Sequence, residues 1–247
     1  MRGVLLAGGS AVRLRPLTKV TNKHLLPVYK KPMIYYPLET LLKVGIKDIL
    51  IVTGGEHVGD FFQLLGSGKE WGAHFSYEIQ EGNTGTGAAL LLAEEFVRDE
   101  AFMVILGDNV VVEDVGKFVQ NFKAEKEQYK AKILIAKVKD PQKYGVVEFD
   151  GQKIKNIVEK PKKPASNYVN TGLWMFSPEV FGLLKDLKKS PRGEYEVTDV
   201  LSHYARQQVL SYSILKGPWT DAGSFESLYN ATVLMKKFED RQLKKSK

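Results

Sequence analysis

Short apolar runs alternate with amphipathic stretches along the first half of the chain. Continuous apolar runs, typical of strands buried on both faces of a parallel sheet, occupy residues 3–7, 48–53 and 101–106. A run of alternating polarity predicts one more strand over 75–80. Apolar residues at helical spacing predict helices over 33–44, 57–65 and 88–97. Strands that alternate with helices predict the α/β class, as a doubly wound, mostly parallel, Rossmann-like sheet.

The second half of the chain is richer in strands, which are expected over 132–137, 145–149, 153–158 and 168–176. Asp150-Gly151 is a hairpin signal between the middle two. A long helix is expected over 225–243. Because no repeat and no long Pro, Gly or Ser linker interrupts the sequence, we expect one domain over 1–242. A smaller sheet-rich lobe occupies its second half, and a basic tail follows at 243–247.

Composition and charge exclude several classes of protein. The net charge is +7, but the last twelve residues carry +4 of it, so the body lacks the basic face of a nucleic-acid-binding protein. No apolar stretch approaches the roughly 18 residues of a membrane span. Cysteine is absent, which excludes disulfides and thiolate metal sites and gives no sign of secretion. We therefore expect a cytoplasmic protein with neither nucleic acid nor membrane as its partner.

The loop after the first predicted strand is a candidate phosphate site. Gly8 and Gly9 allow backbone N–H groups to approach an anion, and Arg13 and Lys23 add positive charge within the same loop. The order of residues is not that of a P-loop. An ordinary surface turn is the competing interpretation, and the two nearby cations disfavour it.

Two carboxylates are candidates for metal or catalytic work. Asp108 follows the buried strand 101–106, and ligands of such sheets bind outside the carboxyl ends of the strands. Asp221 lies far along the chain, after Trp219. A turn former or a helix cap is the competing interpretation of each, and on local sequence alone it is favoured for Asp221 but not for Asp108.

Several motifs together resemble the sugar-1-phosphate nucleotidyltransferase family, closest to its short-form glucose-1-phosphate thymidylyltransferases. They occur in the family's order, at 6–18, 31–38, 107–109, 144–150, 159–161, 192–194 and 219–223. The similarity runs from Arg2 to about Gln242, without the left-handed β-helix that many relatives append. It implies transfer of a nucleotidyl group from a nucleoside triphosphate to a sugar 1-phosphate with release of pyrophosphate. The substrates implied are dTTP and glucose 1-phosphate, and the product dTDP-glucose.

The resemblance also implies roles for matching positions in this chain. Residues 1–130, approximately, would bind the nucleotide and 131–242 the sugar phosphate, in a homo-oligomer. Arg13, Lys23 and Asp108 would be catalytic, and Asp108 and Asp221 would hold Mg²⁺. The implied nucleotide contacts are Leu6, Gly8, Gly9, Ser10, Arg13, Lys23, Gln80 and Gly85. The implied sugar-phosphate contacts are Asn109, Gly145, Glu159, Lys160 and Val169.

The chain departs from the family pattern at the nucleotide site. Ala11 and Val12 replace a Gly and a Thr, His24 stands where Gln is common, and segment 81–84 differs from the usual nucleotide loop. An added Cβ at residue 11 disfavours positive φ, and Val12 lacks a hydroxyl donor. Two alternatives therefore stay open. One is an enzyme that uses UTP or another sugar phosphate, and the other is a weakly active regulatory subunit that binds nucleotide or sugar phosphate.

Overall fold

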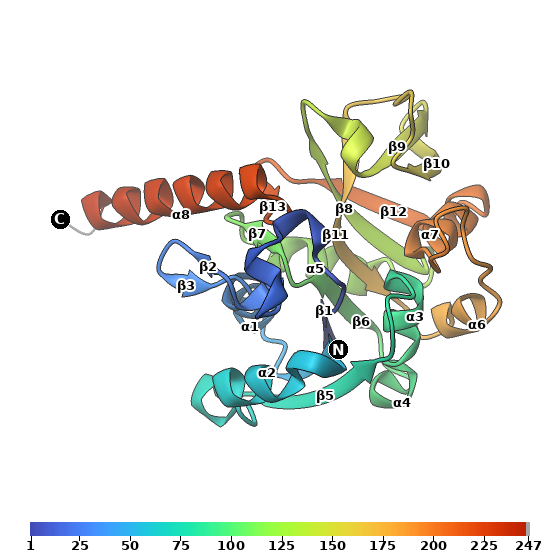
Figure 1. Ribbon diagram of the computed structural model, residues 1–247. Coiled ribbons are helices and arrows are strands. Elements are labelled where there is room, and N and C mark those ends of the chain that lie inside the picture. Colours follow the sequence, from blue (N-terminus) through green and yellow to red (C-terminus); the bar gives the residue numbers. More distant parts are fainter. Residues whose placement is uncertain (246–247) are drawn as a thin grey trace.

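A nine-stranded sheet forms the centre of the fold (Figure 1). The computed structural model describes residues 1–245. Parallel strands in the order β6-β1-β4-β5 build its first part. The central strand β1 pairs with both β6 and β4, so its carboxyl end lies between two others. These strands are β1 (Arg2–Ala7), β4 (Asp48–Gly54), β5 (His74–Gln80) and β6 (Phe102–Leu106).

The second half of the chain extends the same sheet. Strand β11 lies antiparallel to β6 and pairs with β8 and β9 on its other side, while β10 and β12 complete the edges. These strands are β8 (Ala131–Lys137), β9 (Gly145–Asp150), β10 (Lys153–Glu159), β11 (Tyr168–Phe176) and β12 (Leu210–Ile214). Two further pairs form small antiparallel sheets: β2 (Pro27–Val28) with β3 (Lys31–Pro32), and β7 (Asn109–Val111) with β13 (Trp219–Asp221).

Helices cover both faces of the sheet because alternate strand residues point to opposite sides. Val4 and Val104 contribute to one core with α3, α4, α6 and α7, whereas Leu5 and Ile105 contribute to the other with α1, α2 and α5. The helices are α1 (Tyr35–Lys43), α2 (Val58–Leu65), α3 (Thr86–Leu91), α4 (Glu94–Val97), α5 (Gly116–Ala124), α6 (Val180–Lys185) and α7 (Val197–Arg206). Single 3₁₀ turns are η1 (Val12–Leu14), η2 (Leu17–Lys19), η3 (Lys23–Leu25), η4 (Gly55–His57), η5 (Lys69–Trp71) and η6 (Pro141–Lys143).

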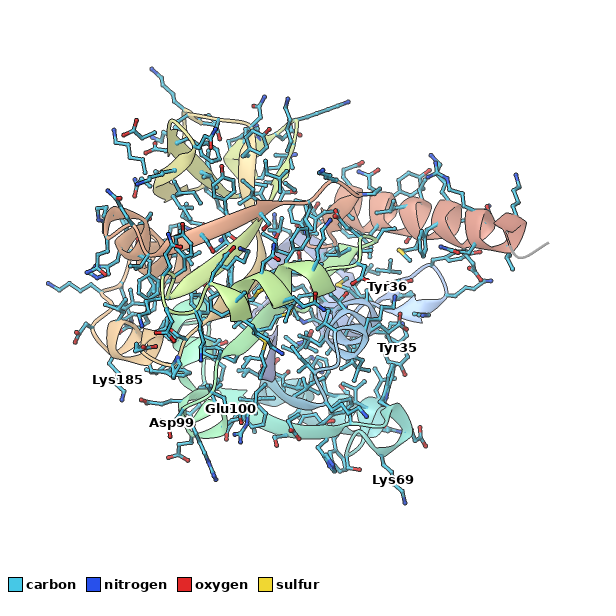
Figure 2. All side chains as sticks on the ribbon, turned by 180° about the vertical axis from the view of Figure 1, so that it is seen from behind. Tyr35, Tyr36, Lys69, Asp99, Glu100 and Lys185 are labelled. Carbon is cyan, nitrogen blue, oxygen red and sulfur yellow. The ribbon has the colours of Figure 1, made fainter. Side chains whose placement is uncertain are left out.

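A third core joins the N-terminal loop to the last helix, α8 (Phe225–Lys245). Leu14, Tyr36 and Ala231 are buried there together, and Tyr36 donates its hydroxyl hydrogen to the carbonyl of Val28. Figure 2 shows Tyr35 and Tyr36 from behind, on the side of the molecule where α8 leaves the body. This core holds the loop that follows β1 against the strands that follow β6.

The α/β class and the mostly parallel architecture are confirmed, and each predicted strand is present within two residues of its bounds. The single helix predicted over 88–97 is wrong, because Ala93 donates its N–H to Leu90 at 3.0 Å and this tight turn separates α3 from α4. Sequence analysis missed α5, α6 and α7 and strands β7, β12 and β13, most of which are too short to show a period. In the described part of the chain, no β-helix follows, and no helix is long and apolar enough to cross a membrane.

The end of the chain extends the predicted last helix by two residues, to Lys245. Residues 246–247 of the predicted basic tail, 243–247, lie outside the described residues. The division of the domain near residue 130 stays a prediction.

Phe102 is the residue whose loss should weaken the fold most clearly. It is fully buried, stacks on Phe181 at 5.4 Å between ring centroids, and lies 5.8 Å from Phe176. Replacing it with alanine should lower the free energy of unfolding by about 3–5 kcal/mol, as measured by urea denaturation. The matched control is Phe62→Ala, since Phe62 is 59% exposed and its loss should cost less than about 1 kcal/mol. Equal losses for the two variants would contradict this assignment of the core.

Candidate active site

Two cavities meet at the carboxyl ends of β1 and β6, and Asp108 lines both. One has a volume of about 150 Å³ and lies beside the loop that follows β1. The other has a volume of about 180 Å³ and is lined mostly by residues of the second half of the chain. Thr86, Leu106 and Glu194 also line both cavities. A ligand in one cavity would therefore lie directly beside a ligand in the other.

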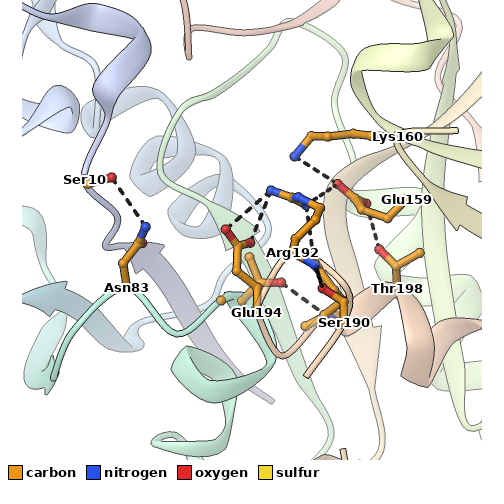
Figure 3. A network of polar contacts seen from close by, with 12 residues as sticks. Ser10, Asn83, Glu159, Lys160, Ser190, Arg192, Glu194 and Thr198 are labelled. Atoms are coloured by element: carbon orange, nitrogen blue, oxygen red, sulfur yellow. Dashed lines mark hydrogen bonds and ion pairs between the residues drawn. The ribbon is translucent and has the colours of Figure 1, made fainter. Parts of the chain in front are cut away.

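The first cavity gathers most of the residues predicted to contact a nucleotide. Its lining includes Leu6, Gly8, Gly9, Lys23, Gln80 and Gly85. Arg13 lines the second cavity instead, next to Asp108 and Asp221. Ser10 lines neither cavity, and its hydroxyl accepts a long hydrogen bond of 3.4 Å from Asn83 (Figure 3).

The second cavity gathers four of the five residues predicted to contact a sugar phosphate: Asn109, Gly145, Glu159 and Lys160. The fifth, Val169, is fully buried in β11 and is not part of the lining, whereas its neighbour Asn170 is. Trp219 also lines this cavity and donates its indole hydrogen to Asn109 at 2.5 Å.

Asp108 and Asp221 come together although more than 100 residues separate them. The pairing of β13 with β7 sets Asp221 opposite Asn109, and Ala222 donates its N–H to the carbonyl of Asp108 at 2.9 Å. A Cβ placed on Gly223 would lie 2.9 Å from Arg13 Nη2, 3.0 Å from Asp221 Oδ2 and 3.3 Å from Asp108 Oδ2. Two carboxylates and a guanidinium therefore converge on one point beside Gly223, where a Cβ would crowd all three.

The two carboxylates are held in different electrostatic environments. Lys23 Nζ donates to Asp108 Oδ2 at 2.6 Å. Burial opposes ionisation of Asp108, but the charge and hydrogen bond of Lys23 and the charge of Arg13 outweigh it and lower its pKa. Burial and the charge of Asp108 raise the pKa of Asp221, whose Oδ1 accepts a hydrogen bond of 2.9 Å from the Tyr144 hydroxyl.

His24 is a neutral residue at the edge of the first cavity. Burial, and then the adjacent charge of Lys23, lower its pKa to about 3. Asn22 Oδ1 accepts the backbone N–H of His24 at 3.0 Å and also lies 2.8 Å from His24 Nδ1. Because that oxygen can only accept, Nδ1 carries the proton and Nε2 is left as an acceptor.

The donor set fits a magnesium ion that is completed by substrate. Among residues 1–245 no group of three or more His, Cys, Asp or Glu side chains could enclose a metal by itself. Mg²⁺ is usually held by one or two carboxylates, with water and phosphate oxygens filling the other positions. Asp108 and Asp221 provide such a pair, and the mutual repulsion that raises the pKa of Asp221 is what a divalent cation would relieve.

A polar network beside Glu159 contains residues to which sequence analysis gave no role. Arg192 lies between three carboxylates, 3.0 Å from Glu196, 3.5 Å from Glu159 and 3.3 Å from Glu194 (Figure 3). Thr198 donates its hydroxyl hydrogen to Glu159 at 3.0 Å. The motif at 192–194 was a usable signal for this network, since a charged Arg-Gly-Glu turn carries donors and acceptors close together.

The departures from the family pattern have visible structural consequences. Ala11 adopts a left-handed conformation with φ of 44°, which a glycine would adopt at lower cost. The Thr18 hydroxyl donates to the carbonyl of Ala11 at 2.9 Å and helps to hold this conformation. Val12 is 57% exposed and lines neither cavity.

Replacing Asp221 with asparagine should raise the melting temperature of the metal-free protein at neutral pH. The pKa of Asp221 is raised in the folded state, so its ionisation removes stability as the pH rises from about 4 towards 7. The gain of Asp221→Asn over the wild type should therefore grow with pH, as measured by thermal denaturation in EDTA. Asp240→Asn, a change at an exposed position on α8, should show no such growth. A gain that is independent of pH would contradict the raised pKa of Asp221.

Comparisons with known proteins agree with this geometry. Residues 2–237 match the family model described as nucleotidyl transferase. The glucose-1-phosphate thymidylyltransferase of Neisseria meningitidis is 39% identical over 98% of this chain and 85% of its own length. That of Mycolicibacterium smegmatis is 40% identical over 98% and 84%.

Two solved structures share the fold. One is a Bacillus anthracis protein, provisionally assigned as a glucose-1-phosphate thymidylyltransferase and crystallised with a sucrose. It superposes with a TM-score of 0.90 at 46% identity, covering 95% of this chain and 94% of that one. A UDP-glucose pyrophosphorylase bound to UDP-glucose superposes with a TM-score of 0.84 at 27% identity, covering 96% and 98%. This chain therefore belongs to the nucleotidyl transferase family.

Proposed function

We propose that this protein transfers a nucleotidyl group from a nucleoside triphosphate to a sugar 1-phosphate, forming dTDP-glucose from dTTP and glucose 1-phosphate. The observation that carries the proposal is the convergence of Asp108, Asp221, Arg13 and Lys23 where the two cavities meet. The names of the relatives at 39–40% identity over nearly the whole chain support the choice of substrates.

The chemistry requires two anions to approach each other. An oxygen of the sugar phosphate attacks the α-phosphorus of the triphosphate, and pyrophosphate leaves. Catalysis then depends on positioning and on positive charge at the reacting phosphorus. Lys23, held by Asp108 at 2.6 Å, and Arg13, close to both carboxylates, supply that charge.

Asp108 and Asp221 would hold the metal, and a bound Mg²⁺ would offset charge on the phosphate oxygens. Glu159 can accept hydrogen bonds from sugar hydroxyls, and Lys160 can turn from Glu159, now 3.2 Å away, towards the sugar's phosphate. These roles, like association into a homo-oligomer, are proposals that rest on the family resemblance and on the cavity lining.

A second candidate keeps the reaction and replaces dTTP with UTP. The superposition on a UDP-glucose pyrophosphorylase supports UTP as an alternative substrate. A pocket gains only about 1–3 kcal/mol from one methyl group, so the methyl of thymine by itself gives modest discrimination. A weakly active regulatory subunit is the less favoured alternative, because Asp108, Asp221, Arg13 and Lys23 are all retained and brought together.

The proposed function predicts a definite pattern of pyrophosphate release. Purified protein with Mg²⁺ should be assayed with dTTP, UTP, CTP, GTP and ATP, each crossed with several sugar 1-phosphates. The highest kcat/KM should be with dTTP and glucose 1-phosphate, and EDTA should abolish the signal because the metal offsets phosphate charge. A higher kcat/KM for another pair would identify that pair as the substrates. No pyrophosphate release with any pair, from protein that still binds nucleotide, would favour the regulatory subunit.

Restoring the family residues in the loop after β1 tests whether this loop limits turnover. The double change Ala11→Gly with Val12→Thr removes the cost of a left-handed alanine and adds a hydroxyl donor to the loop after β1. We expect kcat/KM for dTTP to rise about three- to ten-fold, which is the value of one or two hydrogen bonds. An unchanged or lower kcat/KM would show that the loop has adapted to its own residues.

A further inference from the structure

Tyr144 contacts Asp221 from a different part of the fold. It lies between η6 and strand β9, and its hydroxyl donates to Asp221 Oδ1 at 2.9 Å. Its ring contacts the ring of Trp219 edge to face, with 5.5 Å between the two centroids. All three residues line the second cavity. The proposed reaction does not yet use this hydroxyl, although it lies on one of the two carboxylates at the centre of the site.

The backbone on both sides of Tyr144 is held by hydrogen bonds. Tyr144 donates its N–H to the carbonyl of Pro141 at 3.0 Å, and its own carbonyl accepts the N–H of Lys160 at 2.9 Å. The next residue, Gly145, pairs with Glu159 in the hairpin of β9 and β10. Because none of these contacts involves β13, the backbone position of Tyr144 does not depend on the carboxylate to which its hydroxyl donates.

The two oxygens of Asp221 have different surroundings. Oδ1 accepts the hydrogen bond from Tyr144, whereas Oδ2 is turned towards Asp108 and Arg13, beside Gly223. Repulsion between the two carboxylates favours turning Asp221 away from Asp108. The hydrogen bond from Tyr144 opposes that rotation, since a rotated carboxylate would lose its donor.

We propose that Tyr144 is a positioning residue for the metal site, holding Asp221 Oδ1 so that Oδ2 stays turned towards Asp108. Carboxylates that bind metals are themselves held by hydrogen bonds, and losing such a partner lowers the affinity for the metal by about 10–100-fold. The edge-to-face contact with Trp219 keeps the Tyr144 ring beside the carboxylate. The inference rests on the proposed function, since it takes Asp108 and Asp221 to hold Mg²⁺.

The test measures binding of Mn²⁺, which takes the same oxygen ligands as Mg²⁺, to the protein without substrate. Free Mn²⁺ is measured by electron paramagnetic resonance for the wild type and for Tyr144→Phe, which keeps the ring and removes the hydroxyl. The Kd for Mn²⁺ should rise about ten-fold or more.

Tyr212→Phe is the matched control in the same half of the chain. The Tyr212 hydroxyl donates to the carbonyl of Gln152 at 3.0 Å, and its ring contacts Phe149 edge to face at 5.5 Å. Tyr212 lines neither of the two cavities that meet at Asp108. Losing this hydroxyl should leave the Kd for Mn²⁺ within about two-fold of the wild type, as expected for a distant and independent site.

An unchanged or lower Kd in Tyr144→Phe would overturn the inference, because the hydroxyl would then be idle or would compete with the metal for Asp221. The Mg²⁺ concentration for half-maximal pyrophosphate release should also rise in this variant. A higher KM for glucose 1-phosphate with an unchanged Mg²⁺ requirement would instead make Tyr144 a sugar contact and overturn the inference. Asp221→Asn should remove most of the Mn²⁺ binding. If it does not, the metal assignment in the proposed function fails, and the inference fails with it.

Discussion

Lys23 and Asp108 form an ion pair of 2.6 Å below the surface, at the point where two parallel strands end. Burying these charges is costly unless each has a partner, and Asp221 adds a second carboxylate to the same place. Arg13 and the Tyr144 hydroxyl offset part of that repulsion, and the pKa of Asp221 is still raised. The centre is thus arranged around charge that the protein alone does not fully balance, which agrees with the proposed binding of a metal and phosphates there.

The sheet provides the rigidity that such a centre needs. Strand β1 pairs with β4 and β6 along its length, and apolar side chains pack on both faces, so the ends of these strands have little freedom to move. The small β7–β13 sheet then brings Asp221 to Asp108, and the third core under α8 holds the loop that carries Arg13. Repulsive groups stay together because backbone pairing and packing, rather than the groups themselves, determine their positions.

One segment of the chain, residues 190–196, contacts the surroundings of both cavities. Segment 190–196, which carries Arg192 into the network beside Glu159, also forms hydrogen bonds with the backbone of Thr84 and Gly87 beside the first cavity. Residues from the second half of the chain therefore shape the surroundings of Gln80. The linings of the two cavities are connected by hydrogen bonds and ion pairs of this one segment.

The sequence by itself determined the α/β class and eight of the nine strands of the main sheet, because apolar runs are local patterns. The family resemblance of its motifs then pointed to residues such as Gly8 and Asp108 that line the cavities. It could not distinguish Asp221 from a turn former, since only the pairing of β13 with β7 brings that carboxylate to Asp108. The tertiary structure also decided that Val169 is buried, that Arg192 faces Glu159, and that Thr84 engages the Gln80 amide. These features depend on contacts between segments distant in the chain or on side-chain geometry, and neither leaves a periodic signal in the sequence.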